Sequence, residues 1–310
     1  MKRSTIAIII PVFNVKNVVN ETLLSVKNQV SPPDEVIIID DGSTDGSINT
    51  LNNFKDLDGW KIIQTTNQGL GLTRNFGRSI ATSKYVHFLD SDDIVKNDFI
   101  FRMRQVIKCY NYPDIILFSG ESFDDNKKNN KKPNLKFTLQ GEYFRNSKLI
   151  TKLVKKKESF PQVSRYITKT QLWSKNKLNY SKGVAQDDEI FFPLLALSKS
   201  TVVIPDVYFS YRVGRPGSIT TVIPESNYAK DYLRGIKYTL TFMNVRYDLI
   251  KPDLSAWCYR LERRGLKYIN MCLKTKTPIS WSIILILFYK VKSISFPFKL
   301  FWRILRHFFR

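Results

Sequence analysis

The stretch that decides the fold is residues 85–93, which read YVHFLDSDD. A mostly apolar run is followed at once by three carboxylates within four positions. Parallel strands that are buried on both faces read as near-continuous apolar runs, so residues 85–89 predict a strand inside a covered sheet. The acids then follow the carboxyl end of the strand, where open α/β sheets bind their ligands.

The acids of this stretch, Asp90, Asp92 and Asp93, suggest a cation site. Like charges this close together repel one another unless a cation or hydrogen bonds offset them. Mg²⁺ takes oxygen ligands, usually one or two carboxylates together with substrate phosphates. The stretch therefore predicts a metal and diphosphate site. Taken alone, it is equally compatible with a solvated turn that caps the next helix, because Asp is favoured at N-caps.

Length and composition fit a globular α/β domain with a second unit or a long extension, since the chain has 310 residues of which 43% are hydrophobic. A net charge of +22 requires an anionic partner, such as nucleotide phosphates or an anionic membrane. The basic residues form no recognised nucleic-acid motif, so no nucleic acid is expected as a partner. The three cysteines predict reduced thiols in a cytoplasmic setting, and no signal peptide is expected.

Strand and helix patterns alternate through the first half of the chain. Strands are predicted over 5–11, 35–39, 60–64, 85–89 and 114–118, with a first helix capped at Asn14 and later helices over 72–81 and 97–110. This alternation predicts a parallel sheet with right-handed crossovers. Residues 121–140 are polar and predict a surface loop or hairpin. Strands become sparse after residue 142, and helices are predicted over 146–157, 187–197, 227–247 and 255–272.

A second pair of acids, Asp40 and Asp41, follows the second predicted strand, so it should lie at the same edge of the sheet as the acids of 85–93. The glycines within 67–71 let the backbone approach a ligand closely. Arg74 comes one turn into the following helix, where it is placed for an anionic group. Together these stretches predict a site for a nucleotide diphosphate.

Four segments of the first half resemble the family 2 glycosyltransferases, inverting enzymes of the GT-A fold. They are IAIIIPVFN (6–14), EVIIIDDGSTDGS (35–47), NQGLGLTRNFGR (67–78) and HFLDSDD (87–93), which follow the order of the family. The resemblance implies an α/β GT-A nucleotide-diphospho-sugar transferase fold, a mostly parallel sheet flanked by helices with a helical C-terminal extension. It suggests a nucleotide-sugar-binding half over 1–120, an acceptor-side half over 121–222 and a helical extension over 223–310.

The resemblance implies that residues of all four segments bind the nucleotide-sugar. They are Pro11, Phe13, Asn14, Asn67, Gly71, Arg74, Asp90 and Ser91, with Asp40 or Asp41 facing the uridine of a UDP-sugar. Asp90, Ser91 and Asp92 would form an Asp-x-Asp motif for a divalent cation, Mn²⁺ or Mg²⁺. Whether Asp92 or Asp93 binds the ion directly stays open.

The segment GVAQDDEIF (183–191) resembles the Glu-Asp-x-x-Phe segment of the family, whose Asp is the catalytic base. Asp187 stands where Glu is usual, so the resemblance assigns the base to Asp188. Asp187 and Glu189 remain alternatives, and so does a structural role for these acids at a helix N-terminus.

The segments YFSYR (208–212) and RPGSIT (215–220) resemble a further part of the family. The resemblance suggests diphosphate or acceptor contacts from four residues: Asp187, Arg212, Arg215 and Ser218. The planar fork of arginine suits phosphate. The alternative is a plain surface loop with scattered arginines.

The resemblance thus implies an inverting hexosyl- or N-acetylhexosaminyl-transferase with a surface-glycan or lipid-linked acceptor. An acceptor hydroxyl that attacks an anomeric carbon needs a base, and the leaving diphosphate needs positive charge nearby. One alternative is a nucleotidyltransferase of similar fold, although PVFN is not the glycine- and arginine-rich loop typical of that class. Another is a non-enzymatic basic membrane-binding protein.

The tail begins with ISWSIILILFY (279–289), which is shorter than the roughly 20 apolar residues that a membrane span needs. Six cations follow it among phenylalanines and a tryptophan: Lys290, Lys292, Lys299, Arg303, Arg306 and Arg310. Aromatic residues among cations are typical of segments that lie in the membrane interface. Residues 279–310 therefore predict a cytoplasmic protein held peripherally on the inner face of the cell membrane. The alternative is a helix packed on the domain or in the seam of a homodimer.

Overall fold

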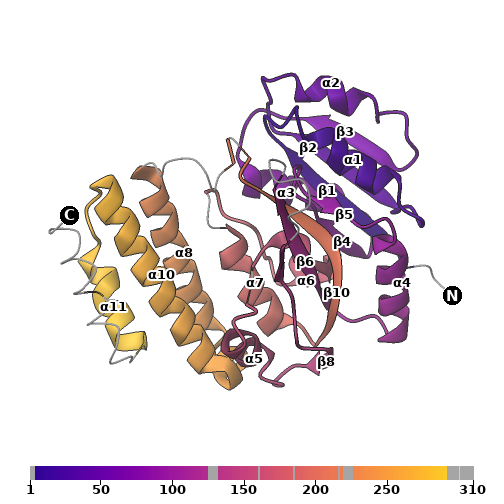
Figure 1. Cartoon of the computed structure of the whole chain (residues 1–310). Coiled ribbons are helices and arrows are strands. Elements are labelled where there is room, and N and C mark those ends of the chain that lie inside the picture. Colours follow the sequence, from indigo (N-terminus) through magenta and orange to yellow (C-terminus); the bar gives the residue numbers. More distant parts are fainter. Residues whose placement is uncertain are drawn as a thin grey trace.

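The computed structural model describes residues 4–124, 132–159, 161–183, 186–215, 217–218, 226–291 and 300, without the side chains of residues 132, 133, 186, 188, 226 and 227. One mixed sheet runs through this part of the chain (Figure 1), with its main strands in the order β3-β2-β1-β4-β9-β6-β10-β5. Two further strands, β7 and β8, pair with β6 and β10 beside this path.

The first half alternates strands and helices, as its sequence predicts. It comprises β1 (Ile6–Val12), α1 (Val19–Lys27), β2 (Glu35–Asp40), α2 (Ser47–Asn52), β3 (Trp60–Gln64), α3 (Leu70–Ile80), β4 (Tyr85–Phe88), β5 (Ile94–Val95), α4 (Phe99–Cys109) and β6 (Ile115–Asp124). β1 pairs in parallel with β2 and β4, and β2 pairs in parallel with β3. The predicted cap at Asn14 is wrong: this residue has a left-handed backbone with φ of 50°, and α1 begins at Val19.

The second half adds more strands than its sequence predicts. It comprises β7 (Lys132–Leu135), β8 (Gly141–Phe144), α5 (Leu149–Lys155), the short turn η1 (Val163–Arg165), β9 (Tyr166–Lys169), α6 (Thr170–Lys175), α7 (Gln186–Leu197), β10 (Ser200–Val213), α8 (Ser226–Val245), α9 (Tyr247–Ile250), the turn η2 (Lys251–Asp253), α10 (Leu254–Thr275) and α11 (Trp281–Val291). β9 lies antiparallel between β4 and β6, and β10 runs parallel to β6. The sheet is therefore mixed. Strands are sparse after residue 142, as expected, but β9 and β10, which the sequence did not predict, join the central sheet.

Alternate residues of the central strands face two different cores. Ile8 and Ile38 point toward one face of the sheet, which is covered by α1, α2 and α4. Ile9 and Ile39 point toward the other face, which is covered by helices of the second half together with α3. Successive side chains of a strand point to opposite faces, so a strand covered on both faces reads as the continuous apolar run seen in β1, β2 and β4.

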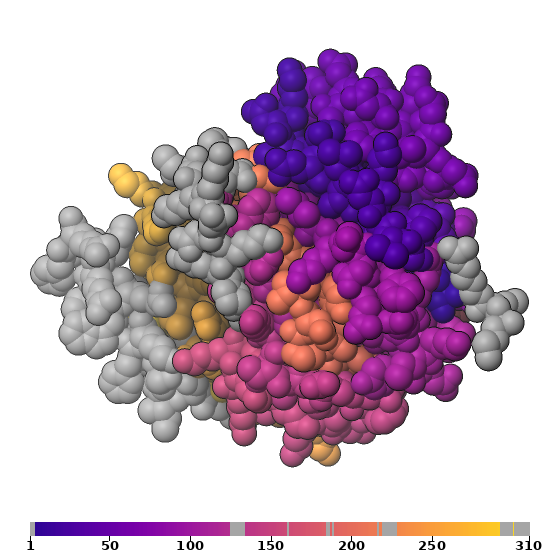
Figure 2. All heavy atoms as spheres, turned by 45° about the vertical axis from the view of Figure 1, so that its right-hand side comes forward, coloured from indigo at the N-terminus to yellow at the C-terminus, as the bar shows by residue number. Residues whose placement is uncertain are grey.

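The C-terminal helices α8, α10 and α11 pack beside one another, away from the N-terminal half, and α7 lies between them and the sheet (Figure 1). Trp257 of α10 is fully buried, and its ring centroid lies 5.7 Å from that of Phe192 in α7 and 5.4 Å from that of Phe242 in α8. In Figure 2 the yellow atoms of these helices lie on the opposite side from the indigo and purple atoms of the first half. The helical extension thus shares a core with α7, a point that matters for the site below.

Gly77 lets α3 lie close against the sheet. A Cβ atom at this position would lie 2.5 Å from Ile9 Cγ2 and 2.9 Å from Ile39 Cδ1, and both isoleucines are fully buried. We expect Gly77→Ala to lower the free energy of unfolding by about 1–3 kcal/mol, the usual effect of overpacking a core. Urea denaturation measures the difference, with Ser79→Ala on the exposed side of the same helix as the control. Equal stability of the two variants would contradict the close approach.

Candidate active site

The carboxyl ends of β1, β2 and β4 lie side by side, because these strands are parallel neighbours. Val12 at the end of β1 is opposite Asp40 in β2, and Asp90 comes two residues after the end of β4. The prediction that the two groups of acids gather at one edge of the sheet is therefore confirmed. The loops that follow these three strands form the candidate site.

Hydrogen bonds join the loop after β1 to the loop after β2. The backbone N–H of Asn14 donates to Ser43 Oγ at 3.0 Å, and Asn14 Oδ1 accepts from the N–H of Thr44 at 2.8 Å. The N–H of Lys16 donates to Asp45 Oδ2 at 2.9 Å. Burial by itself raises the pKa of Asp45, but hydrogen bonds from the Ser47 hydroxyl and from the N–H groups of Lys16 and Ser47 outweigh it and lower the pKa. The two loops are thus locked to each other.

Asp40 and Asp41 are both buried, and both carboxylates already accept hydrogen bonds from the protein. Asp41 accepts from the backbone N–H groups of Gln68 at 3.0 Å and Gly69 at 2.8 Å, which fixes the loop before α3. Asp40 accepts from the N–H of Ser43 at 3.1 Å. These two acids therefore stabilise the loops at this edge of the sheet from inside the protein, and a contact with uridine stays a prediction.

Of the other residues implied for the donor, Pro11, Gly71 and Ser91 are buried, whereas Phe13 and Asn67 are exposed.

The guanidinium of Arg74, in α3, joins Asp90 to Asp187. Its Nη2 lies 2.5 Å from Asp90 Oδ1, and its Nη1 lies 2.5 Å from Asp187 Oδ1. The Arg74 side chain is only 1% exposed and stacks over the ring of Tyr180, 5.3 Å from its centroid. Burial by itself lowers the pKa of Arg74, but the charges of Asp187 and Asp90 outweigh it and raise the pKa. The guanidinium therefore stays charged between the two acids.

Asp92 and Asp93 lie in different surroundings. The carboxylate of Asp93 is buried, with one oxygen 3.1 Å from the N–H of Arg212 and the other 3.2 Å from Ser164 Oγ. The Asp92 side chain is 17% exposed, and its Oδ2 lies 2.9 Å from Arg215 Nε. Burial, followed by the charge of Asp90, raises the pKa of both carboxyls. This corner thus carries negative charge that a cation would offset, and Asp92 rather than Asp93 is open to a ligand.

Asp90 and Asp92 together fit a divalent cation that arrives with its substrate. Their side chains are 29% and 17% exposed, and carboxylate oxygens are the ligands that Mg²⁺ and Mn²⁺ take. Within the described residues no group of three or more His, Cys, Asp or Glu side chains is arranged to hold a metal. Mg²⁺ is usually held by one or two carboxylates with substrate phosphates, so a closed cage of protein ligands is not required.

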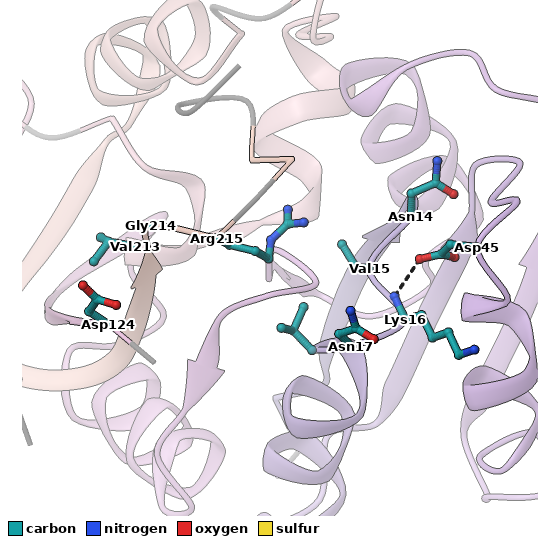
Figure 3. Close-up of a pocket in the computed structure, with 10 residues that line it drawn as sticks. Asn14, Val15, Lys16, Asn17, Asp45, Asp124, Val213, Gly214 and Arg215 are labelled. Atoms are coloured by element: carbon teal, nitrogen blue, oxygen red, sulfur yellow. Dashed lines mark hydrogen bonds between the residues drawn. The ribbon is translucent and has the colours of Figure 1, made fainter. Parts of the chain in front are cut away.

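A pocket of about 320 Å³ opens next to Arg215 (Figure 3). Residues 14–18 line one side of the pocket. Residues 213–215, at the C-terminal end of β10 and just after it, line the other side, and Asp45 and Asp124 complete the lining. In Figure 3 the side chain of Arg215 extends from the β10 side toward the loop that carries Asn14. The sequence assigned roles to Asn14 and Arg215. Asp45 lies within the family-like segment 35–47 but was given no role, and Lys16 and Asn17 lie outside the four segments.

Arg212 connects β10 to α1 and to the acidic loop. Its side chain is 1% exposed, with Nη2 2.6 Å from Glu21 Oε2 and the guanidinium 4.6 Å from the ring centroid of Phe123. Its Nε donates to the carbonyl of Asp92 at 2.9 Å. Arg212 thus supports the acidic loop from within the protein, and the contact with diphosphate implied for it stays a prediction. The N–H of Ser218 donates to the carbonyl of Arg215 at 3.2 Å, within the loop that follows β10.

The first turn of α7 carries the three acids considered for the catalytic base. Asp187 is paired with Arg74, as described above. Glu189 is 3% exposed, accepts from Ser181 Oγ at 2.5 Å and lies 3.8 Å from Nη2 of Arg264 in α10. The side chain of Asp188 lies outside the described residues, so the assignment of the base to Asp188 stays a prediction. Its two neighbours have arginine partners within the protein.

Residues 7–171, more than half of the chain, match the family model described as Glycosyl transferase family 2. The chain belongs to glycosyl transferase family 2. Poly(ribitol-phosphate) beta-glucosyltransferase of Bacillus spizizenii is 31% identical over 78% of this chain and 40% of its own length. An uncharacterized glycosyltransferase of Haemophilus influenzae is 46% identical over 32% of this chain and 40% of its own length. This chain thus spans about 40% of the length of these two relatives.

Solved structures of S. aureus TarS resemble this chain in fold. The complex of TarS 1-349 with UDP gives a TM-score of 0.69 at 17% identity and covers 96% of this chain and 88% of that one. The complex of the same TarS fragment with UDP-GlcNAc gives a TM-score of 0.65 at 16% identity and covers 88% of each chain. The predicted family and GT-A fold are confirmed.

Proposed function

We propose that this member of family 2 transfers a hexose or N-acetylhexosamine, with inversion, from a nucleotide-sugar to a hydroxyl of a surface glycan or lipid-linked acceptor. One observation carries the proposal. Arg74 forms ion pairs with Asp90, which lies beside Asp92 in the loop after β4, and with Asp187 in the first turn of α7. A UDP-sugar is the favoured donor, in keeping with the UDP and UDP-GlcNAc bound in the TarS structures. A polymer such as the poly(ribitol phosphate) of the B. spizizenii relative is a suitable class of acceptor.

The donor would occupy the pocket between residues 14–18 and 213–215 together with the adjacent strand ends. Arg215 brings a cation to this pocket, and arginine suits phosphate oxygens. Phe13 is 46% exposed at the same edge and offers an apolar surface for a base or ribose. Pro11, Asn67, Gly71 and Ser91, as the resemblance implies, would complete the donor site.

Asp90 and Asp92 would hold the divalent cation, Mn²⁺ or Mg²⁺, through their carboxylate oxygens. A divalent cation bound there stabilises the negative charge that develops on the departing diphosphate. Asp93 is not proposed as a ligand, because both of its oxygens already accept hydrogen bonds from Arg212 and Ser164. Arg215, which is 2.9 Å from Asp92, adds further positive charge at this point.

Asp188 would act as the base on the acceptor hydroxyl. The hydroxyl oxygen forms the new bond to the anomeric carbon while the bond from that carbon to the diphosphate oxygen breaks. The hydroxyl proton passes to the Asp188 carboxylate, and the nucleoside diphosphate leaves with the bonding electrons. A single displacement inverts the anomeric configuration, so no second carboxylate nucleophile is needed.

We propose three functional regions along the chain. Residues 1–120 bind the donor, residues 121–222 carry the base and face the acceptor, and residues 223–310 extend the enzyme toward the membrane. The first two regions share one sheet, because β9 and β10 lie beside strands of the first half. They are therefore functional halves of one folded unit.

A screen of nucleotide-sugars with Mn²⁺ or Mg²⁺ tests the proposed reaction. Slow hydrolysis of the correct donor should release its nucleoside diphosphate even without an acceptor, and we expect UDP from a UDP-sugar. A nucleotidyltransferase of similar fold would instead release pyrophosphate from a nucleoside triphosphate. If no nucleotide-sugar yields a diphosphate, the proposal is wrong.

We also propose that the enzyme works peripherally on the cytoplasmic face of the membrane, with α11 at the lipid surface. Four residues of α11 expose between 43% and 74% of their surface, at positions spaced along one side of the helix: Trp281, Leu285, Ile286 and Tyr289. Ile283, Ile284 and Leu287 are buried against the rest of the protein. Within the described ranges, no helix has the length and apolar character needed to cross a bilayer. An exposed apolar and aromatic face near cations is typical of interfacial helices.

Of the cations predicted to flank this segment, Lys290 lies in the described part of the chain. Lys292, Lys299, Arg303, Arg306 and Arg310 lie outside it. Their attraction to an anionic leaflet, about 1 kcal/mol for each, is therefore part of the proposal.

Changing Leu285 and Ile286 together to Glu should abolish flotation with anionic liposomes, because it places two carboxylates on the proposed lipid face. Release of UDP from a soluble donor should stay near that of the unmodified chain. Val30→Glu is the matched control, since Val30 is 68% exposed, like Leu285, but lies near the N-terminal end of the sheet. Two results would contradict the membrane role of α11. One is that the unmodified chain does not float with liposomes, and the other is that it forms a homodimer which the double change dissociates. Either would indicate that the exposed face of α11 packs against protein.

A further inference from the structure

Arg74 lies beneath the candidate site rather than on its surface. Its side chain is 1% exposed, whereas those of Asp90 and Asp187 are 29% and 27% exposed. The ring of Tyr180 covers one face of the guanidinium. A ligand that enters from solvent therefore meets the two carboxylates before it meets the arginine.

The two carboxylates depend on Arg74 to lie so close together. Like charges repel, but the buried guanidinium of Arg74 between the two carboxylates offsets this repulsion. It donates a charge-assisted hydrogen bond of 2.5 Å to each of them. The planar fork of arginine can reach one acid with each terminal nitrogen, whereas a lysine has a single ammonium group. Asp90 follows β4 and Asp187 lies in α7, so this bridge connects the donor edge of the sheet to the helix of the second half.

The first turn of α7 is held on its other side as well. Glu189 is bound by Ser181 and lies beside Arg264 of α10. A Cβ atom on Gly235 of α8 would lie 1.9 Å from Nη2 of Arg264, so the extension is tightly packed here. The position of residue 188 between these two neighbours is thus determined jointly by α3 and α10.

We propose that Arg74 is a positioning residue that couples the donor edge at Asp90 to the orientation of the first turn of α7. The inference rests on the proposed function, because it assigns Arg74 an effect on the step that uses Asp188. It differs from the direct donor contact that the family resemblance implies for Arg74. A positioning residue of this kind affects turnover, whereas a donor contact affects donor affinity.

Steady-state kinetics with the UDP-sugar identified above separate the two roles. Arg74→Gln should lower kcat by about 10- to 100-fold, the range in which misplacement of a catalytic group acts, while the donor KM changes little. Asp187→Asn should have a similar effect. The double variant should be no slower than the worse single variant, because residues that act as a unit are not additive. An increase in donor KM with unchanged kcat, or additive losses, would overturn the coupling.

Arg78 supplies the matched control. It lies one turn further along α3, stacks on Trp173 at 5.5 Å and donates to Asn179 at 2.8 Å, without an acidic partner among these contacts. Arg78→Gln should keep kcat within about threefold of the unmodified chain. Circular dichroism establishes that each variant is folded. If Arg74→Gln does not fold, Asp187→Asn, which keeps the pair of Arg74 and Asp90, gives the same comparison.

Amide hydrogen exchange across residues 187–191 adds a measurement that does not depend on turnover. Arg74→Gln and Asp187→Asn should speed exchange in this segment, and Arg78→Gln should not. If the unmodified chain releases no diphosphate from any nucleotide-sugar, the proposed function fails, yet the exchange data still report whether Arg74 holds α7. Unchanged exchange in both Arg74→Gln and Asp187→Asn would overturn the positioning role itself.

Discussion

Asp188→Asn is expected to lower the rate of sugar transfer by about 100-fold or more, the usual contribution of a general base. Asparagine keeps the shape of the side chain and much of its hydrogen bonding but cannot take the proton of the acceptor hydroxyl. UDP binding should survive, because the donor site is formed by the strand ends and the pocket beside Arg215. Turnover is measured by UDP release with acceptor present, and binding by calorimetry.

Glu189→Gln is the matched control for this prediction, since it removes a carboxylate one position away. Glu189 is buried against Ser181 and Arg264, so its change should lower the thermal midpoint of unfolding and leave turnover of the folded enzyme largely intact. Near-normal turnover of Asp188→Asn, combined with loss of turnover in Asp187→Asn or Glu189→Gln, would show that the base is a different residue of this turn.

Asp92→Ala is expected to cause the second large loss. Charge stabilisation by a bound cation contributes several kcal/mol, and each 1.4 kcal/mol is about a factor of ten. We therefore expect transfer to fall by about 100-fold or more, together with loss of the Mn²⁺-dependent part of UDP binding. UDP release at increasing Mn²⁺ concentration measures the change.

Asp93→Asn separates a cation ligand from a residue that supports the loop. Asp93 is buried between the N–H of Arg212 and Ser164 Oγ, so its change should lower stability but keep the response to Mn²⁺. If Asp93→Asn lost that response while Asp92→Ala kept it, the ligand would be Asp93. If both variants kept the metal dependence of the unmodified chain, neither Asp92 nor Asp93 would be a ligand of the cation.

The strands of the first half could be predicted because their signals are local. β1, β2 and β4 are buried on both faces, so nearly every residue in them is apolar, and acids or asparagine follow at the edge. The predicted strands over 35–39 and 85–89 correspond to β2 and β4 to within one residue. Parallel neighbours then bring their carboxyl ends together, which places the predicted acids at one edge without further information.

The strands of the second half were missed for two physical reasons. β9 is four residues long, and its place between β4 and β6 depends on pairing with distant parts of the chain. β10 contains Pro205 where its pairing with β6 shifts in register, and a proline within a run argues against a strand. Both strands are stabilised by tertiary pairing, which a local pattern does not record.

In the candidate site, too, local sequence signals were predictive and contacts between distant segments were not. The acids and Arg74 stand at positions that motifs identify, and the resemblance to the family supplied most of their roles. The partners of these residues could not be predicted, because they come from distant segments: Asp187 for Arg74, Glu21 for Arg212 and Ser164 for Asp93. No periodicity links such pairs, so the support of the acidic loop becomes visible only in the folded chain.

The central claim is that the strand-end acids bind a nucleoside diphosphate together with a divalent cation. Calorimetric titration of the unmodified chain with UDP, once in Mn²⁺ and once in EDTA, tests this claim most directly. The account predicts clear binding in Mn²⁺ and an affinity at least about tenfold lower in EDTA, a difference of about 1.4 kcal/mol or more. Equal affinity in the two buffers, or no binding of UDP in either, would contradict it.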